Sequence, residues 1–121
     1  MALENKLKIS AVTFFTKNMN AATHFYSKIP GFDMVYRNSE NSFVTFKIND
    51  QFINLEYNKN KTSDFGRIIF HVENVDRLYA HLMHSEISDR IEQAPRDANW
   101  GERFFYVRDP DNHQIAFARP I

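Results

Sequence analysis

The chain has 121 residues, enough for one domain with a buried core and too few for two ordinary domains. Its fifteen basic and fifteen acidic side chains cancel, so we expect no overall field that attracts nucleic acid or an anionic membrane. Cysteine is absent, which excludes disulfides, thiolate metal sites and a cysteine nucleophile and leaves the cytoplasm as the expected location.

The first half of the chain predicts the element order βαβββ. Polar and apolar residues nearly alternate over residues 8–16, which predicts a strand with one face on a core. An apolar stripe at helical spacing follows over residues 19–29, with Asn18 or Asn20 as its N-cap and a Pro-Gly pair at its end. Three short strands separated by polar turns complete this half, at residues 32–37, 42–48 and 52–57.

The second half repeats the first after a polar linker at residues 58–65. A strand over residues 67–72 leads to Asn74 as a second N-cap and to a second helical stripe from Val75 to Leu82. Adding 56 to a residue number aligns the halves, and an internal repeat explains this most simply. The aligned pairs include Val12 with Ile68, Phe14 with Phe70, Asn18 with Asn74 and Met19 with Val75.

A hairpin ends the chain, with strands predicted over residues 103–108 and 114–119. The tight turn between them contains Asp109, Pro110, Asp111 and Asn112. Proline suits the second turn position because its φ is already fixed, and asparagine tolerates the positive φ that such turns require.

Several motifs in this order resemble the glyoxalase/bleomycin resistance protein/extradiol dioxygenase (vicinal oxygen chelate) superfamily. They are the two βαβββ halves, Phe25 and Tyr26 before Gly31, Trp100 with Gly101, and the turn from Asp109, where Asn112 replaces the glycine often found. The resemblance implies one α+β domain over residues 1–121. Paired βαβββ modules, at about residues 8–57 and 66–120, would form a curled mixed sheet around a cavity, with the helices packed outside.

The resemblance also implies four strand positions where metal-dependent relatives place His or Glu. Those positions carry Ala11, Asn54, Arg67 and Ala116 here. The alanines have no donor atom, Arg67 has a fixed positive charge, and Asn54 offers only a weak carbonyl oxygen. We therefore expect no metal site of the family type and no cofactor.

The concave faces of the implied sheet are the predicted ligand site. Arg67 either pairs with Glu56 as a structural ion pair or binds a ligand carboxylate or phosphate. Trp100 either closes over the cavity as a lid or packs against the strand that follows it. The predicted lining is Thr13, Phe15, Asn54, Glu56, Arg67, Ile69, Trp100 and Gln114, with Ala11, Ala116 and Ala118 on the same faces.

The histidines give no catalytic pattern by spacing, so no catalytic residue is assigned. We expect His71 to make a single hydrogen bond near a strand end, and His81 and His84 to lie on a solvated helix face with Arg77. His24 and His113 have no partner by spacing, and both are expected at the surface.

Two functional hypotheses follow from the resemblance. The first is a metal-free protein that binds or sequesters a small molecule, as bleomycin-resistance members of the family do. The alternative is an enzyme of the same superfamily, of the glyoxalase-like lyase or isomerase type or the dioxygenase type. It would use a divalent metal in another register or Glu56 or His71 as a base. The resemblance further implies a homodimer, and neither hypothesis calls for a nucleic acid or a membrane.

Overall fold

The computed structural model describes residues 9–64 and 66–121 and confirms the predicted α+β class. The first module contains β1 (Ala11–Thr16), α1 (Met19–Ser27), β2 (Asp33–Arg37), β3 (Phe43–Ile48) and β4 (Gln51–Tyr57). The second contains β5 (Arg67–His71), α2 (Val75–Met83), the 3-10 helix η1 (Ser88–Arg90), β6 (Arg96–Asp97), β7 (Glu102–Arg108) and β8 (Gln114–Pro120).

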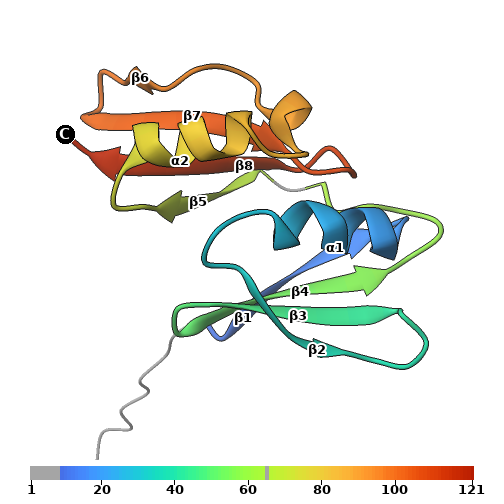
Figure 1. Cartoon of the computed structure of the whole chain (residues 1–121). Helices are drawn as coiled ribbons and strands as arrows, with labels where there is room; N and C mark the ends of the chain where they lie inside the picture. Colours follow the sequence, from blue (N-terminus) through green and yellow to red (C-terminus); the bar gives the residue numbers. More distant parts are fainter. Residues whose placement is uncertain (1–8, 65) are drawn as a thin grey trace, which may run out of the picture.

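Each module forms its own four-stranded mixed sheet with the same topology (Figure 1). The strand order is β1-β4-β3-β2 in the first sheet and β5-β8-β7-β6 in the second. In both, the first strand pairs in parallel with the last, and the other pairs are antiparallel. The repeat seen in the sequence is therefore a repeat of the structure, and the two four-stranded mixed sheets are consistent with the predicted curled sheet.

The two helices occupy equivalent places in the repeat. Residues 19–27 and 75–83 differ by the same offset of 56 that aligns the sequence halves. Asn18 caps α1 by accepting a hydrogen bond from the Ala21 amide at 3.0 Å, and Asn74 caps α2 by accepting one from the Arg77 amide at 2.9 Å. Of the two cap residues that the sequence allowed for α1, Asn18 is therefore the one in use.

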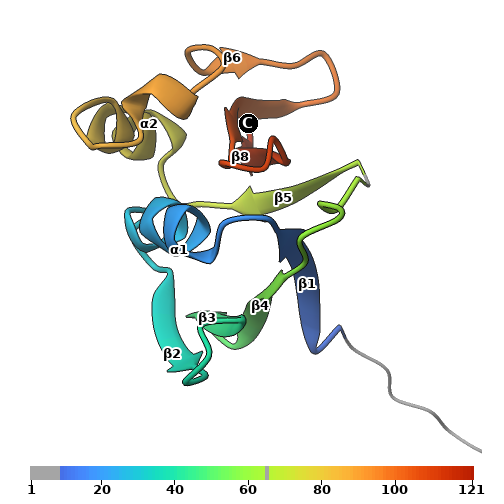
Figure 2. The same cartoon turned by 90° about the vertical axis from the view of Figure 1, so that its right-hand side faces the viewer.

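The core is continuous across both modules. On β1, Phe14 and Thr16 are buried beneath α1, while Thr13 and Phe15 lie on the opposite face. Figures 1 and 2 show both helices on the same side of the molecule, so each sheet has one face covered by a helix and one face without. Phe32 of the first module contacts Phe70 of the second, with ring centroids 5.3 Å apart.

The segment between α2 and β7 holds two elements that the sequence analysis did not predict, η1 and β6. Arg103 of β7 connects this segment to α2, because its guanidinium bonds Asp97 of β6 at 3.0 Å and Asp76 of α2 at 2.8 Å. The bonded guanidinium lowers the pKa of Asp76. Neither helix of the described chain has the length and apolar composition that a bilayer crossing requires.

Candidate functional site

The face of the first sheet that lacks a helix, called here the first open face, carries a row of hydrogen-bonded polar side chains. Thr13, Asn54 and Thr45 are neighbours in the register of β1, β4 and β3. The Thr45 hydroxyl donates to Asn54 Oδ1 at 2.8 Å, and Asn54 Nδ2 donates to the Thr13 hydroxyl at 3.3 Å. The amide of Asn54 is therefore already used at both ends.

Aromatic residues flank Glu56 in the strand register of this first open face. Phe15 and Phe43 are its register partners on either side. Tyr36 of the edge strand β2 lies beside Phe43, with ring centroids 6.4 Å apart, and is 53% exposed. Tyr36 and Phe43 were not among the predicted lining residues. Their position beyond β4 depends on the strand order, which the alternation within one strand does not reveal.

The corresponding face of the second sheet, called here the second open face, places Arg67 in a defined position. Its Nε donates to Gln114 Oε1 at 2.7 Å across the β5–β8 pair, and its guanidinium lies 4.9 Å from the centroid of the Tyr106 ring. Gln114 Nε2 donates to Glu92 at 3.1 Å, and Arg108 also donates to that carboxylate. Arg67 and Gln114 were predicted here, whereas Tyr106 and Glu92 were not.

Trp100 lies at the other end of the second open face and packs against the strand that follows it. Its ring stacks on Phe104 at 5.5 Å, and its Nε1 donates to Glu102 Oε1 at 3.0 Å. The indole is 64% exposed. His71 bonds the same carboxylate through Nε2 at 3.0 Å, so it makes the hydrogen bond expected near a strand end.

The ion pair between Glu56 and Arg67, one of the two alternatives for Arg67, does not form in the described chain. Glu56 belongs to β4 in the first sheet, and Arg67 belongs to β5 in the second. The guanidinium instead bonds the neutral amide of Gln114. Because an exposed arginine needs no buried counterion, no acidic partner is required at this position.

The residues at the four family ligand positions do not fit a divalent metal. Ala11 and Ala116 have no donor, Arg67 is a cation, and the carbonyl oxygen of Asn54 accepts the Thr45 hydroxyl. Within residues 9–64 and 66–121, no three His, Asp or Glu side chains form a group that could hold a metal ion.

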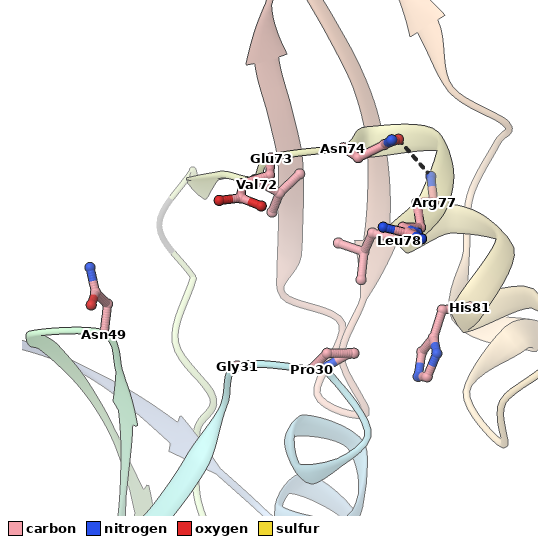
Figure 3. A pocket seen from close by; sticks show the side chains of 9 residues that line it. All are labelled: Pro30, Gly31, Asn49, Val72, Glu73, Asn74, Arg77, Leu78 and His81. Atoms are coloured by element: carbon pink, nitrogen blue, oxygen red, sulfur yellow. Dashed lines mark hydrogen bonds between the residues drawn. The ribbon is translucent and has the colours of Figure 1, made fainter.

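A large hollow lies on the helix side of the described chain and holds none of the predicted lining residues. It is an open groove of about 770 Å³ at the N-terminal half of α2 (Figure 3). A smaller hollow of about 250 Å³ lies where the two sheets meet, and Ile69 lines it. Lining the large groove are Pro30, Gly31, Asn49, Val72, Glu73, Asn74, Arg77, Leu78 and His81.

A buried polar cluster joins the two modules. It contains His113, which was wrongly predicted to lie at the surface. His113 is 7% exposed, not at the surface, and its Nδ1 donates to Asp109 Oδ2 at 2.7 Å. The Tyr26 hydroxyl of α1 donates to the same oxygen at 2.7 Å. Sequence spacing within the second half could have suggested the Asp109–His113 pair, whereas Tyr26 is 83 residues away. His24, expected at the surface, does lie there, paired with Glu86.

Burial and the carboxylate set the proton affinities in this cluster. Burial, followed by the charge and hydrogen bond of Asp109, raises the pKa of Tyr26 well above 10, so the phenol stays protonated and donates. For His113, burial acts to lower the pKa, but the hydrogen bond and charge of Asp109, with Asp111, raise it above 6.5. The cluster is a structural link between modules and not part of either open face.

The repeated βαβββ topology and the two open sheet faces define the class of protein. A sequence profile of the Glyoxalase/Bleomycin resistance protein/Dioxygenase superfamily matches residues 8–117, and the chain belongs to that superfamily. It is the vicinal oxygen chelate family that the sequence motifs resemble. No curated protein matches the chain at a significant level.

Solved structures share this fold at low sequence identity. A bleomycin resistance determinant encoded on transposon Tn5 is 15% identical with a TM-score of 0.76, covering 94% of this chain and 98% of its own. A lactoylglutathione lyase from Agrobacterium tumefaciens is 20% identical with a TM-score of 0.75, covering 95% of each chain. A glyoxalase/bleomycin resistance protein/dioxygenase from Nocardioides is 18% identical with a TM-score of 0.75, covering 98% and 87%.

Proposed function

We propose that this chain binds a small, partly apolar molecule on its open sheet faces without using a metal. The observation that carries the proposal is the chemistry of the four family ligand positions, where two alanines, a bonded asparagine and an arginine replace metal donors. The surrounding aromatic side chains supply the apolar surface that small-molecule sites use. We propose the cytoplasm as the place of action, since a cysteine-free chain needs no oxidising compartment to fold.

We further propose that two copies of the chain form a homodimer through these faces. In the single chain, Ile69 and Trp100 on the second open face, and Tyr36 on the first, are each more than half exposed. Soluble proteins rarely leave large apolar side chains clustered on one face without a partner or ligand. A second copy placed over an open face would enclose the ligand and exclude water from it.

The single tryptophan provides the experiment for the binding function. Trp100 stacks on Phe104 on the second open face, so a ligand on that face should change its fluorescence. Chelated, metal-free protein is titrated with a panel of small aromatic and aliphatic acids, amines and neutral compounds. The proposal predicts saturable quenching by a subset of the panel in the presence of chelator. Quenching that requires added metal would contradict it.

A second candidate function, general-base catalysis, is favoured by the pair of His71 and Glu102. A histidine oriented by a carboxylate at 3.0 Å on an accessible face is the arrangement that proton abstraction uses. This candidate predicts that metal-free protein exchanges the α-protons of bound carbonyl compounds in D2O, followed by NMR. The variant His71→Gln would then lose exchange, whereas pure binding predicts no exchange in either protein.

A further inference from the structure

The guanidinium of Arg67 is held in place and still has unused donors. Its Nε is fixed by Gln114 at 2.7 Å, and its Cζ lies 4.9 Å from the Tyr106 ring centroid. Gln114 is itself fixed by Glu92 at 3.1 Å. No described side chain or carbonyl bonds the two terminal Nη groups of Arg67. A planar pair of N–H donors therefore faces solvent with little conformational entropy left to lose.

Two other guanidiniums near this face are less suited to an incoming anion. Arg108 donates through Nε to Glu92 and through Nη1 to the Asn112 carbonyl, so one half of its terminal fork is already engaged inside the protein. Arg96 lies over Phe104 at 5.1 Å without a hydrogen bond among the described residues, and Asp97 follows it directly. Among these three, only Arg67 combines a hydrogen-bonded, fixed orientation with two Nη groups that no described residue bonds.

Apolar surface begins directly beside the free donors of Arg67. Ile69 follows two residues later on the same side of β5, about 6.6 Å along the strand, and is 52% exposed. Tyr106 adds an aromatic ring beneath the guanidinium. An anion bonded to Arg67 can thus extend a flat apolar body along β5 toward Ile69.

We infer that the second open face binds a small apolar carboxylate, with the carboxylate held by the Nη groups of Arg67 and the apolar body packed on Ile69. This inference rests on the proposed binding function and names its ligand class. A carboxylate matches the guanidinium fork with two parallel hydrogen bonds, which a neutral amide cannot form. Lysine would keep the charge but lose the fork and its stacking on Tyr106.

Calorimetric titration of the full chain with 2-naphthoate and with its neutral isostere 2-naphthamide tests this inference. We expect naphthoate to bind at least about tenfold more tightly than naphthamide. Arg67→Gln should remove that difference, and Arg67→Lys should restore only part of it. Arg96→Gln is the matched control on the same face and should keep the preference. Because Arg67 is exposed, the variants should unfold at the wild-type temperature.

Equal affinity for the two arenes, or a preference that survives Arg67→Gln, would overturn the carboxylate assignment. If neither arene binds while other compounds quench Trp100, the carboxylate assignment also fails and the general binding function stands. If Arg67→Gln dissociates a dimer at concentrations where the wild type stays dimeric, the guanidinium binds the second copy of the chain, and the carboxylate assignment is wrong.

Discussion

The carboxylate of Asp109 accepts four hydrogen bonds from described residues although it is almost fully buried. The amides of Asp111 and His113 donate to Oδ1, each at 2.9 Å, and the Tyr26 hydroxyl and His113 Nδ1 donate to Oδ2. A buried carboxylate is tolerated only when its acceptor sites are filled in this way. One residue thereby shapes the β7–β8 turn and ties α1 to the second module.

Removing the Tyr26 hydroxyl should weaken the whole fold. Tyr26→Phe leaves a buried carboxylate oxygen with one donor fewer, so we expect a loss of about 1 to 3 kcal/mol in the free energy of unfolding. Urea unfolding followed by circular dichroism measures it. Tyr57→Phe, at a tyrosine that is 46% exposed, is the control and should change stability little. Equal stability of both variants would show that the Asp109 cluster does not connect the modules energetically.

The raised pKa of His113 predicts a pH dependence of stability. Because the folded pKa lies above 6.5, the folded state holds the proton more tightly than the unfolded state. The stabilisation is complete below about pH 6.5 and is lost as pH rises through the folded pKa. His113→Gln should therefore cost more free energy at about pH 5.5 than at about pH 8.5. His84→Gln, at an exposed histidine, is the control, and a pH-independent cost at His113 would contradict the prediction.

Residue type and neighbouring residues predicted backbone conformation and helix capping well, but they predicted burial poorly. The positive φ of Asn112, 69°, and the capping by Asn74 follow from residue type and neighbours alone, and both are confirmed. The burial of His113 was missed because it depends on the other module, whose Phe14 ring stacks on His113 and whose Tyr26 bonds the same Asp109 oxygen. Contacts between distant segments leave no trace in local periodicity.

At the scale of elements, the offset of 56 predicted equivalent helices with equivalent caps. Asn18→Ala and Asn74→Ala should each lower the free energy of unfolding by about 1 kcal/mol, because each removes the acceptor for a first-turn amide. Asn99→Ala, in an exposed turn, serves as the control in the same chemical unfolding series. A loss at only one of the two caps would show that the helices are not energetically equivalent.

The elements that the sequence analysis missed are short and lack periodicity. β6 has two residues and η1 has three, too few to show a repeat of two or of three. Their positions depend on tertiary contacts such as the bonds of Arg103 to Asp76 and Asp97. Both helices and strands such as β1 and β4 span at least one full period and contain buried residues, so they could be located within a few positions.

At the scale of the whole molecule, the open faces should decide the oligomeric state. Light scattering coupled to gel filtration should give the mass of two chains for the wild type. Ile69→Asp places a charge on the second open face and should shift the protein toward the monomer. Met83→Asp, at an equally apolar and 45% exposed site on α2, should leave the dimer intact. A dimer lost only in Met83→Asp would place the interface on the helix side.

The two sheets also explain why the candidate site was only partly predictable. Alternation in β1, β4, β5 and β8 correctly placed Thr13, Asn54, Arg67 and Gln114 on faces without helices. Glu56 and Arg67 lie in different sheets, and Tyr106 lies beside Arg67. Both placements follow from strand order and sheet packing, which the alternation within a single strand does not encode.

Thermal unfolding tests most directly whether the site works without a metal. Chelated protein is unfolded with Zn, Ni, Mn, Fe(II) and Co added singly, and the purified chain is examined by elemental analysis. Binding of a metal to the folded chain would raise its unfolding temperature. Because Ala11, Asn54, Arg67 and Ala116 supply no free donor set, we predict no shift and no stoichiometric metal. A shift of several degrees with one bound metal per chain would contradict metal-free binding and favour metal-dependent enzyme chemistry.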